Sequence, residues 1–216
     1  GSEGGGSGGG GSGGGWPTQS YPYACHTGML PMEPLCLGSA EIDNGFKYRD
    51  QFQACRIDIQ SFQNAMDTHY RCANSELKGL FDKLIKEVPK TYNCYVDFFR
   101  ERDEGDPSTQ CPPINVPRFD GAYVVDGLEY DLGAPRCIRK SKNHNFAPDR
   151  AYELADCKKQ VETFTGKKSY GYSLNAKSAQ GQYDEYMDNL RAEIDRKIDE
   201  AVRKFNCYAR GDKFCY

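Results

Sequence analysis

The sequence contains no closely spaced pair of cysteines, although cysteine is abundant. Its ten cysteines form no Cys-x-x-Cys, and the nearest two, Cys207 and Cys215, have seven residues between them. Structural zinc sites and thioredoxin-like redox sites both use closely paired cysteines, so neither is favoured. The even number predicts five disulfides formed in an oxidising compartment.

Targeting and membrane signals are also missing. No basic-apolar leader of the signal-peptide type is present, and no apolar run approaches the length of about 18 residues that a spanning helix needs. With the cysteines, this predicts a mature or trimmed secreted chain, extracellular or at the cell surface, with the bacterial periplasm as the alternative. The net charge of -3 comes from interspersed charges without a basic stripe, which argues against nucleic acid as a partner.

Motifs for catalysis and for cofactor binding are absent as well. The chain has no GxSxG, HExxH, Walker loop or dinucleotide fingerprint. Of the three histidines, His26 follows Cys25, and His69 lies one helical turn before Cys72. Both cysteines are more useful as halves of disulfides than as a nucleophile or a metal ligand. We therefore predict no enzyme activity, no cofactor and no metal.

The chain changes character along its length. Residues 1–15 are glycine and serine apart from one glutamate, which is typical of a flexible tether, and either an engineered linker or a natural glycine-rich terminus explains them. Prolines and aromatics then favour an extended arm. We divide the chain into a flexible segment (1–15), an arm (16–45), a first helical hairpin (46–100), a loop with a short β-hairpin (101–136) and a second helical hairpin with a tail (137–216).

Apolar spacing of three and four residues predicts most of the fold. One helix runs from near Phe46 to about Cys72, and a second follows Ser75 until Pro89 interrupts it. The Asp-Gly pair at 126–127 predicts a β-hairpin over Tyr123–Asp131. Further helices are expected at 148–163 and 182–205. The predicted class is mainly α, with two tandem antiparallel helical hairpins stapled by disulfides.

The two helical regions resemble one another as internal repeats. Residues 70–95 laid over 183–208 match at 8 of 26 positions, and both end in Asn-Cys-Tyr. A Pro-x-Cys precedes the next cysteine by 19 residues in the first copy and by 20 in the second. The second copy carries an insertion of 11 residues, which we place within 165–176 as an exposed loop.

The hairpin geometry predicts two disulfides. Cys55 and Cys94 lie symmetrically about the proposed turn after Cys72, so their sulfurs should face each other across antiparallel helices. The repeat then pairs Cys157 with Cys207. The partners of the other six cysteines stay open: Cys25, Cys36, Cys72, Cys111, Cys137 and Cys215.

An Arg-Gly-Asp triplet occupies residues 210–212, and it has two interpretations. Integrin-type receptors recognise such a triplet, but three residues are a weak match. Arg210 and Gly211 also suit the end of a helix, with a cation near the carbonyls and a glycine cap. If Cys207 pairs with Cys157, the triplet is not closed into a ring with Cys215. The helix-end interpretation is preferred on the sequence.

Fifteen tyrosines, many near cysteines, suggest contact surfaces, although small cores also use tyrosine as filler. We predict a secreted structural protein that binds other copies of itself through its arm, as a filament or surface-assembly subunit. The alternative is a monomeric adhesion module that binds a surface receptor or polymer through the 165–176 insertion or the Arg-Gly-Asp tail. The candidate contact residues are Trp16, Tyr21, Tyr23, Tyr170, Tyr172, Arg210, Gly211 and Asp212.

Overall fold

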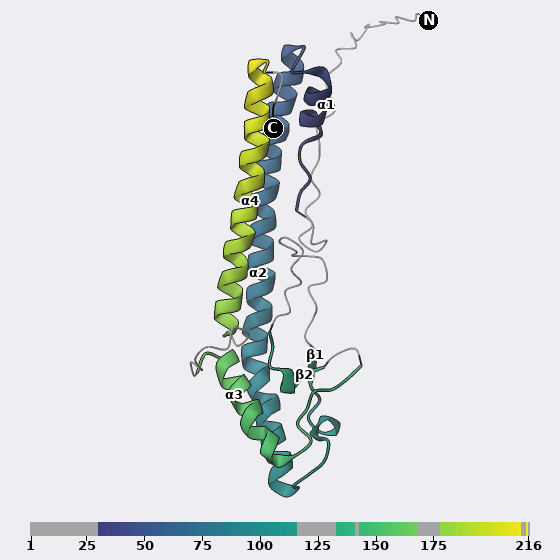
Figure 1. The fold of residues 1–216 in the computed structure, drawn as a ribbon, viewed down its shortest axis with the longest axis vertical. Helices are drawn as coiled ribbons and strands as arrows, with labels where there is room; N and C mark the ends of the chain where they lie inside the picture. Colours follow the sequence, from purple (N-terminus) through teal and green to yellow (C-terminus); the bar gives the residue numbers. More distant parts are fainter. Residues whose placement is uncertain (1–29, 116–132, 141–142, 168–177, 213–214, 216) are drawn as a thin grey trace, which may run out of the picture. The chain divides into compact units, whose positions relative to one another are not determined.

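The computed structural model describes residues 30–115, 133–140, 143–167, 178–212 and 215 (Figure 1). This part of the chain is mainly helical, as the sequence predicts. It divides into two compact units. Unit 1 is built from the described residues of Pro31–Ala65 and Lys197–Tyr216, and unit 2 takes in Met66–Arg196.

Helices account for most of the described residues. The α-helices are α1 (Leu35–Asp43), α2 (Arg49–Glu101), α3 (Leu154–Phe164) and α4 (Ala179–Arg210). Short 3-10 helices occur at η2 (Pro107–Thr109), η3 (Arg136–Ile138) and η4 (Ala151–Glu153). The strands β1 (Ile114–Asn115) and β2 (Arg139–Lys140) pair in parallel. Within the described ranges, no helix is long and apolar enough to cross a membrane.

The first predicted hairpin is wrong, because α2 is one continuous helix of 53 residues with Pro89 inside it. The turn expected between Cys72 and Ser75 does not form. Apolar side chains continue at helical spacing across the expected turn, and Met66, Ala73 and Leu77 are all buried. Asn74 accepts a hydrogen bond from the hydroxyl of Tyr183 through its side chain. A continuous buried stripe therefore outweighs the local turn signal.

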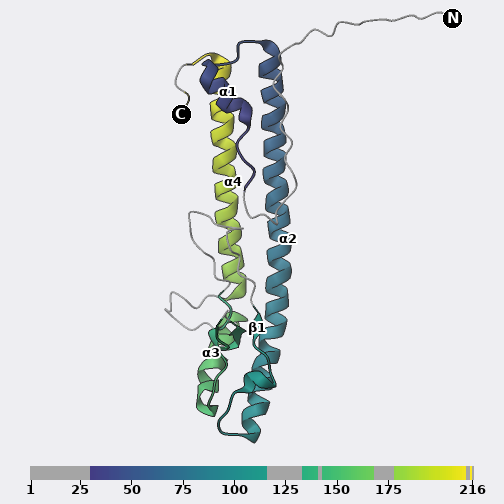
Figure 2. The same cartoon turned by 90° about the vertical axis from the view of Figure 1, so that its right-hand side faces the viewer.

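Unit 1 holds α1, the beginning of α2 and the end of α4 (Figure 2). The helix α1 ends at Asn44 and Gly45, which both have positive φ. Gly45 lies so close to α4 that an added Cβ would be 3.3 Å from the carbonyl oxygen of Tyr208. A disulfide joins Cys36 of α1 to Cys55 of α2. The buried apolar residues of this unit are Cys36, Leu37, Ala40, Cys55, Ile59, Phe62, Ala201 and Tyr208.

Unit 2 holds the rest of α2, the small sheet, α3 and the beginning of α4. The strands pair with Ile114 opposite Arg139, next to the buried Ile138. The disulfides Cys94–Cys111 and Cys137–Cys157 lie here. The largest fully buried side chains of this unit are Tyr95, Phe164, Met66, Leu84, Ile138, Ile194 and Val88.

Both predicted disulfides are wrong. The structure joins Cys36 to Cys55, Cys94 to Cys111, Cys137 to Cys157 and Cys207 to Cys215. Because α2 does not turn back, the 39-residue interval from Cys55 to Cys94 corresponds to about 58 Å of helix, far beyond the reach of a disulfide. Cys72 is also disulfide-bonded.

The observed disulfides nevertheless follow the repeat in the sequence. Each Pro-x-Cys joins the next cysteine along the chain, over 19 residues in one copy and 20 in the other. Each Asn-Cys-Tyr cysteine joins a later one, over 17 and 8 residues. The insertion corresponds to the interval between the end of α3 at Phe164 and the start of α4 at Ala179, whereas α2 is unbroken at the matching place. Unit 1 thus combines the start of the first copy with the end of the second.

Several predictions fall outside the described residues. These are the segment 1–15, most of the arm with Cys25, the hairpin over Tyr123–Asp131, and the residues Tyr170 and Tyr172. The described end of the arm is a correction, because the predicted extended chain is replaced by α1 over Leu35–Asp43. Pro34 stands just before this helix, where its missing N–H costs nothing.

Candidate functional site

The Arg-Gly-Asp triplet lies where α4 ends in unit 1. Arg210 is the last residue of α4, and Gly211 has φ +78°. The N–H of Gly211 donates to the carbonyl of Tyr208 over 3.1 Å, and that of Asp212 donates to the carbonyl of Cys207 over 3.3 Å. These bonds satisfy carbonyls that the helix end would otherwise leave open. The prediction that Arg210 and Gly211 end a helix is confirmed.

The triplet is also enclosed by a disulfide, which corrects the expectation that it would not be. Cys207 and Cys215 are joined, with their Cα atoms 5.6 Å apart. Cys207 belongs to the last turn of α4, so one side of the ring is helical and rigid. The bond fixes the chain on both sides of the triplet. The helix-end and closed-loop interpretations therefore describe the same segment.

The charged side chains of the triplet are directed to solvent. Arg210, Gly211 and Asp212 are all exposed. Within the described part of the chain, neither the guanidinium of Arg210 nor the carboxylate of Asp212 has a hydrogen bond or an ion pair. Both groups are available to a partner. A guanidinium pairs well with a carboxylate, and a carboxylate supplies oxygen ligands to a divalent cation.

The base of the loop is held by an aromatic cluster. The ring of Phe205, on α4, lies 5.2 Å from that of Phe52 and 5.6 Å from that of Phe46, measured between centroids. Phe46 and Phe52 are themselves 5.7 Å apart. Tyr208 is buried, with 5% of its surface exposed. Such aromatic contacts stabilise the end of α4, which carries the polar triplet.

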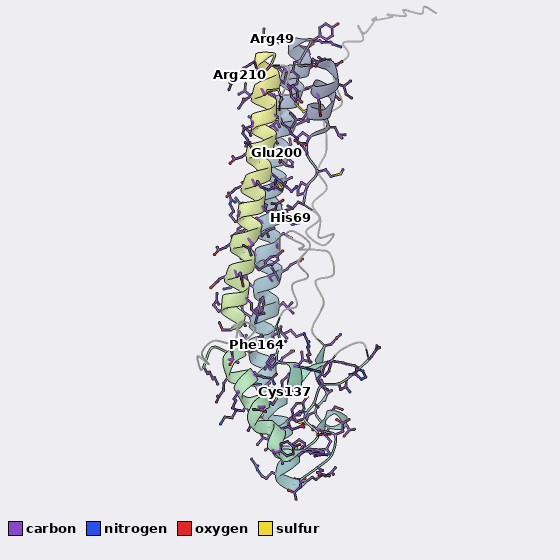
Figure 3. All side chains as sticks on the ribbon, viewed as in Figure 1. Arg49, His69, Cys137, Phe164, Glu200 and Arg210 are labelled. Atoms are coloured by element: carbon purple, nitrogen blue, oxygen red, sulfur yellow. A yellow bond between two sulfur atoms is a disulfide. The ribbon has the colours of Figure 1, made fainter. Side chains whose placement is uncertain are left out.

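A cleft of about 390 Å³ adjoins the loop. One side is the turn between α1 and α2, and the other is the end of α4. Figure 3 labels Arg49 and Arg210, one from each side. The cleft is lined by Asn44, Gly45, Phe46, Lys47, Tyr48, Arg49, Phe52, Tyr208, Ala209, Arg210 and Gly211. Arg49 and this turn could not be found from the sequence, because nothing along the chain links residues 44–52 to residues 208–211.

The other candidate residues are not brought to this site. Trp16, Tyr21, Tyr23, Tyr170 and Tyr172 lie outside the described residues.

Of the two histidine pairs noted in the sequence, only His69 with Cys72 lies within the described residues. His69 is buried in unit 2, and its burial lowers its pKa while the charge of Glu76 opposes that shift. Cys72 is disulfide-bonded, so the His69–Cys72 pair has no free thiol. Across the described ranges, no cluster of three or more His, Cys, Asp or Glu residues could hold a metal ion.

No protein-family model, curated protein or solved structure matches the chain. The geometry of the Arg-Gly-Asp loop and of its cleft therefore carries the functional argument.

Proposed function

We propose that this protein is an adhesion module that presents Arg210, Gly211 and Asp212 to an integrin-type receptor. The observation that carries the proposal is the Cys207–Cys215 disulfide, which closes a loop around an exposed triplet. A segment closed by a disulfide has fewer conformations to lose on binding than a free tail has. The disulfides are compatible with the oxidising, extracellular setting that such a receptor requires.

The chemistry of the loop suits a partner with two features. The guanidinium of Arg210 would pair with a carboxylate of the receptor, and the carboxylate of Asp212 would bind a divalent cation held by the receptor. Gly211 supports the geometry, because its φ of +78° is a conformation that side-chain-bearing residues rarely adopt.

Binding of the full, oxidised chain to an immobilised integrin ectodomain in Mg²⁺ tests the proposal. Asp212→Asn should weaken binding by about 100-fold, since it removes a charge at the contact. Asp199→Asn is the matched control, because Asp199 is an exposed carboxylate on α4 outside the loop. Chelation of Mg²⁺ should abolish binding. Equal binding by the wild type and by Asp212→Asn would refute the proposal.

The role of the ring can be measured separately. The double variant Cys207→Ser, Cys215→Ser opens a loop whose closure stabilises the protein by about 2–3 kcal/mol in the chain-entropy model. Helical circular dichroism should be retained, because Cys36–Cys55 still anchors unit 1. Receptor binding should fall by about tenfold as the loop becomes free. Unchanged affinity would show that the ring contributes nothing to recognition.

Self-association is a second candidate function, and exposed apolar side chains favour it. Met32, Leu35, Ile42 and Tyr48 have 72%, 69%, 83% and 68% of their surfaces exposed. Leu35 and Ile42 are seven residues apart on α1 and so share one helical face. Both residues come shortly after residues 1–29 in the sequence. Exposed apolar side chains on a shared helix face are typical of interaction surfaces, and we propose a second copy of this chain as the partner.

A further inference from the structure

The cleft beside the Arg-Gly-Asp loop has a cationic lining. Among the described residues, its charged lining residues are Lys47, Arg49 and Arg210, and none of those that line it is acidic. Lys47 is neutralised, because its Nζ lies 2.6 Å from a carboxylate oxygen of Asp43. Arg49 and Arg210 are exposed, and neither side chain has a hydrogen bond or an ion pair within the described residues. Two guanidinium groups without an ion pair to any described residue thus border one cleft.

Two acidic residues lie next to lining residues in the sequence. Asp50 follows Arg49 in the first turn of α2, where a carboxylate stabilises the helix end. Asp212 is the acidic member of the triplet. The lining of the cleft is therefore positively charged, and Asp212 follows the lining residue Gly211 directly in the sequence.

The wall that carries Arg49 is well ordered. Gln51 is buried, and its Oε1 accepts hydrogen bonds from the backbone N–H groups of Lys47 at 3.0 Å and Tyr48 at 3.3 Å. Phe46 and Phe52, on either side, belong to the aromatic cluster with Phe205 of α4. The turn before α2 and the base of the loop are consequently parts of one packed structure. The backbone of Arg49 therefore has a defined position relative to the triplet.

We infer that the cleft is a second contact for the receptor, in which Arg49 pairs with an acidic side chain beside the one that Arg210 engages. This inference rests on the proposed function and deepens it. It makes Arg49 a specificity-determining residue outside the triplet. Receptors that present a single carboxylate would bind only the loop, whereas a receptor with a wider acidic surface would bind the loop and the cleft together.

The test compares two charge reversals on the same helix in the full, oxidised protein. Arg49→Glu places an acid in the first turn of α2, which the helix dipole favours, so folding should be kept. Arg56→Glu is the matched control, because Arg56 is exposed on α2 seven residues later and lies outside the cleft. Affinity for an immobilised integrin ectodomain in Mg²⁺ is measured for both, together with Asp212→Asn.

Arg49→Glu should weaken binding by about tenfold, and Arg56→Glu by less than about twofold, since only the first change lies at the contact. Equal effects of the two reversals would overturn the cleft contact, while loss of binding in Asp212→Asn would still uphold the loop. If the wild-type protein does not bind the ectodomain, both the loop contact and the cleft contact are overturned. Binding to immobilised heparin that Arg49→Glu abolishes, with receptor affinity unchanged, would overturn the inference in favour of a sulfated polysaccharide.

Discussion

Tyr95 has a buried hydroxyl group without a partner. Its side chain is 0% exposed, and within the described residues its hydroxyl makes no hydrogen bond. Burial, with a smaller contribution from the negative charge of Asp106, raises the pKa of Tyr95. The phenol is desolvated with no compensating bond, a condition that costs free energy.

Tyr95→Phe should therefore raise the free energy of unfolding, by about 1 kcal/mol, because the ring stays packed and the unpaired hydroxyl is removed. Urea unfolding followed by circular dichroism measures the change. Tyr92→Phe is the control, since Tyr92 is partly exposed and its hydroxyl loses less hydration. A loss of stability in Tyr95→Phe would show that the hydroxyl has a stabilising partner.

His69 predicts a dependence of stability on pH. Burial lowers its pKa from 6.5, so the folded state binds a proton less readily than the unfolded state does. This contribution to stability is fully present above pH 6.5 and is lost as the pH falls toward the folded pKa.

The free energy of unfolding should accordingly decrease between pH 7 and pH 5, and His69→Gln should flatten that slope. Urea titrations at several pH values measure it. His144→Gln, at an exposed position, should keep the slope of the wild type. Identical slopes for the wild type and His69→Gln would contradict the assignment to His69.

At the scale of elements, Pro89 shows how packing overrides a local signal. The sequence pattern predicts that a helix ends at Pro89, yet α2 continues to Glu101. Proline removes one helical hydrogen bond and crowds the preceding turn. The neighbouring Val88 is fully buried, and the apolar stripe continues past it to Tyr95. The burial of this stripe offsets the local cost.

Pro89→Ala should increase the free energy of unfolding by about 1–3 kcal/mol, because it restores the N–H that α2 lacks at this position. The second copy has Val202 at the matching position, inside α4 without an interruption. Thermal unfolding measures the gain, with the exposed Lys90→Ala as the control. A decrease in stability would mean that the proline is needed to shape α2.

The first and second copies differ in their connections. The matching residues form a single helix in the first copy and the separate helices α3 and α4 in the second. The spacing of cysteines and tyrosines predicts an insertion within 165–176 of the second copy, and this placement stays a prediction. The sequence pattern did not predict the continuity of α2. Considered without its neighbouring elements, Ser75 resembles the residue that caps the start of a new helix.

At the scale of the whole molecule, self-association through the arm stays a prediction. Light scattering with size separation on the full chain, beside a version that lacks residues 1–16, tests it. Assemblies that become monomers on truncation would support the arm as the contact. Leu35→Lys with Ile42→Lys should also disperse them if the α1 face is used, because charge on both residues opposes apolar burial. Monomers in every case would refute self-association.

The prediction that the chain is not an enzyme also stays a prediction, and so does its secretion. Both depend on the sequence, in which we find no catalytic motif and an even number of cysteines. The described disulfides are compatible with an extracellular location.

The sequence by itself determined the helical class, the engagement of the described cysteines in disulfides and the helix end at Arg210 and Gly211. These properties depend on periodicity, composition and local backbone preference, which act over a few residues. The tertiary structure alone decided that α2 is continuous, that Cys207 pairs with Cys215, and that Arg49 adjoins the triplet. Each of these depends on which distant segments pack together, because burial of a long apolar stripe outweighs a local turn signal and thereby sets which cysteines and charges meet.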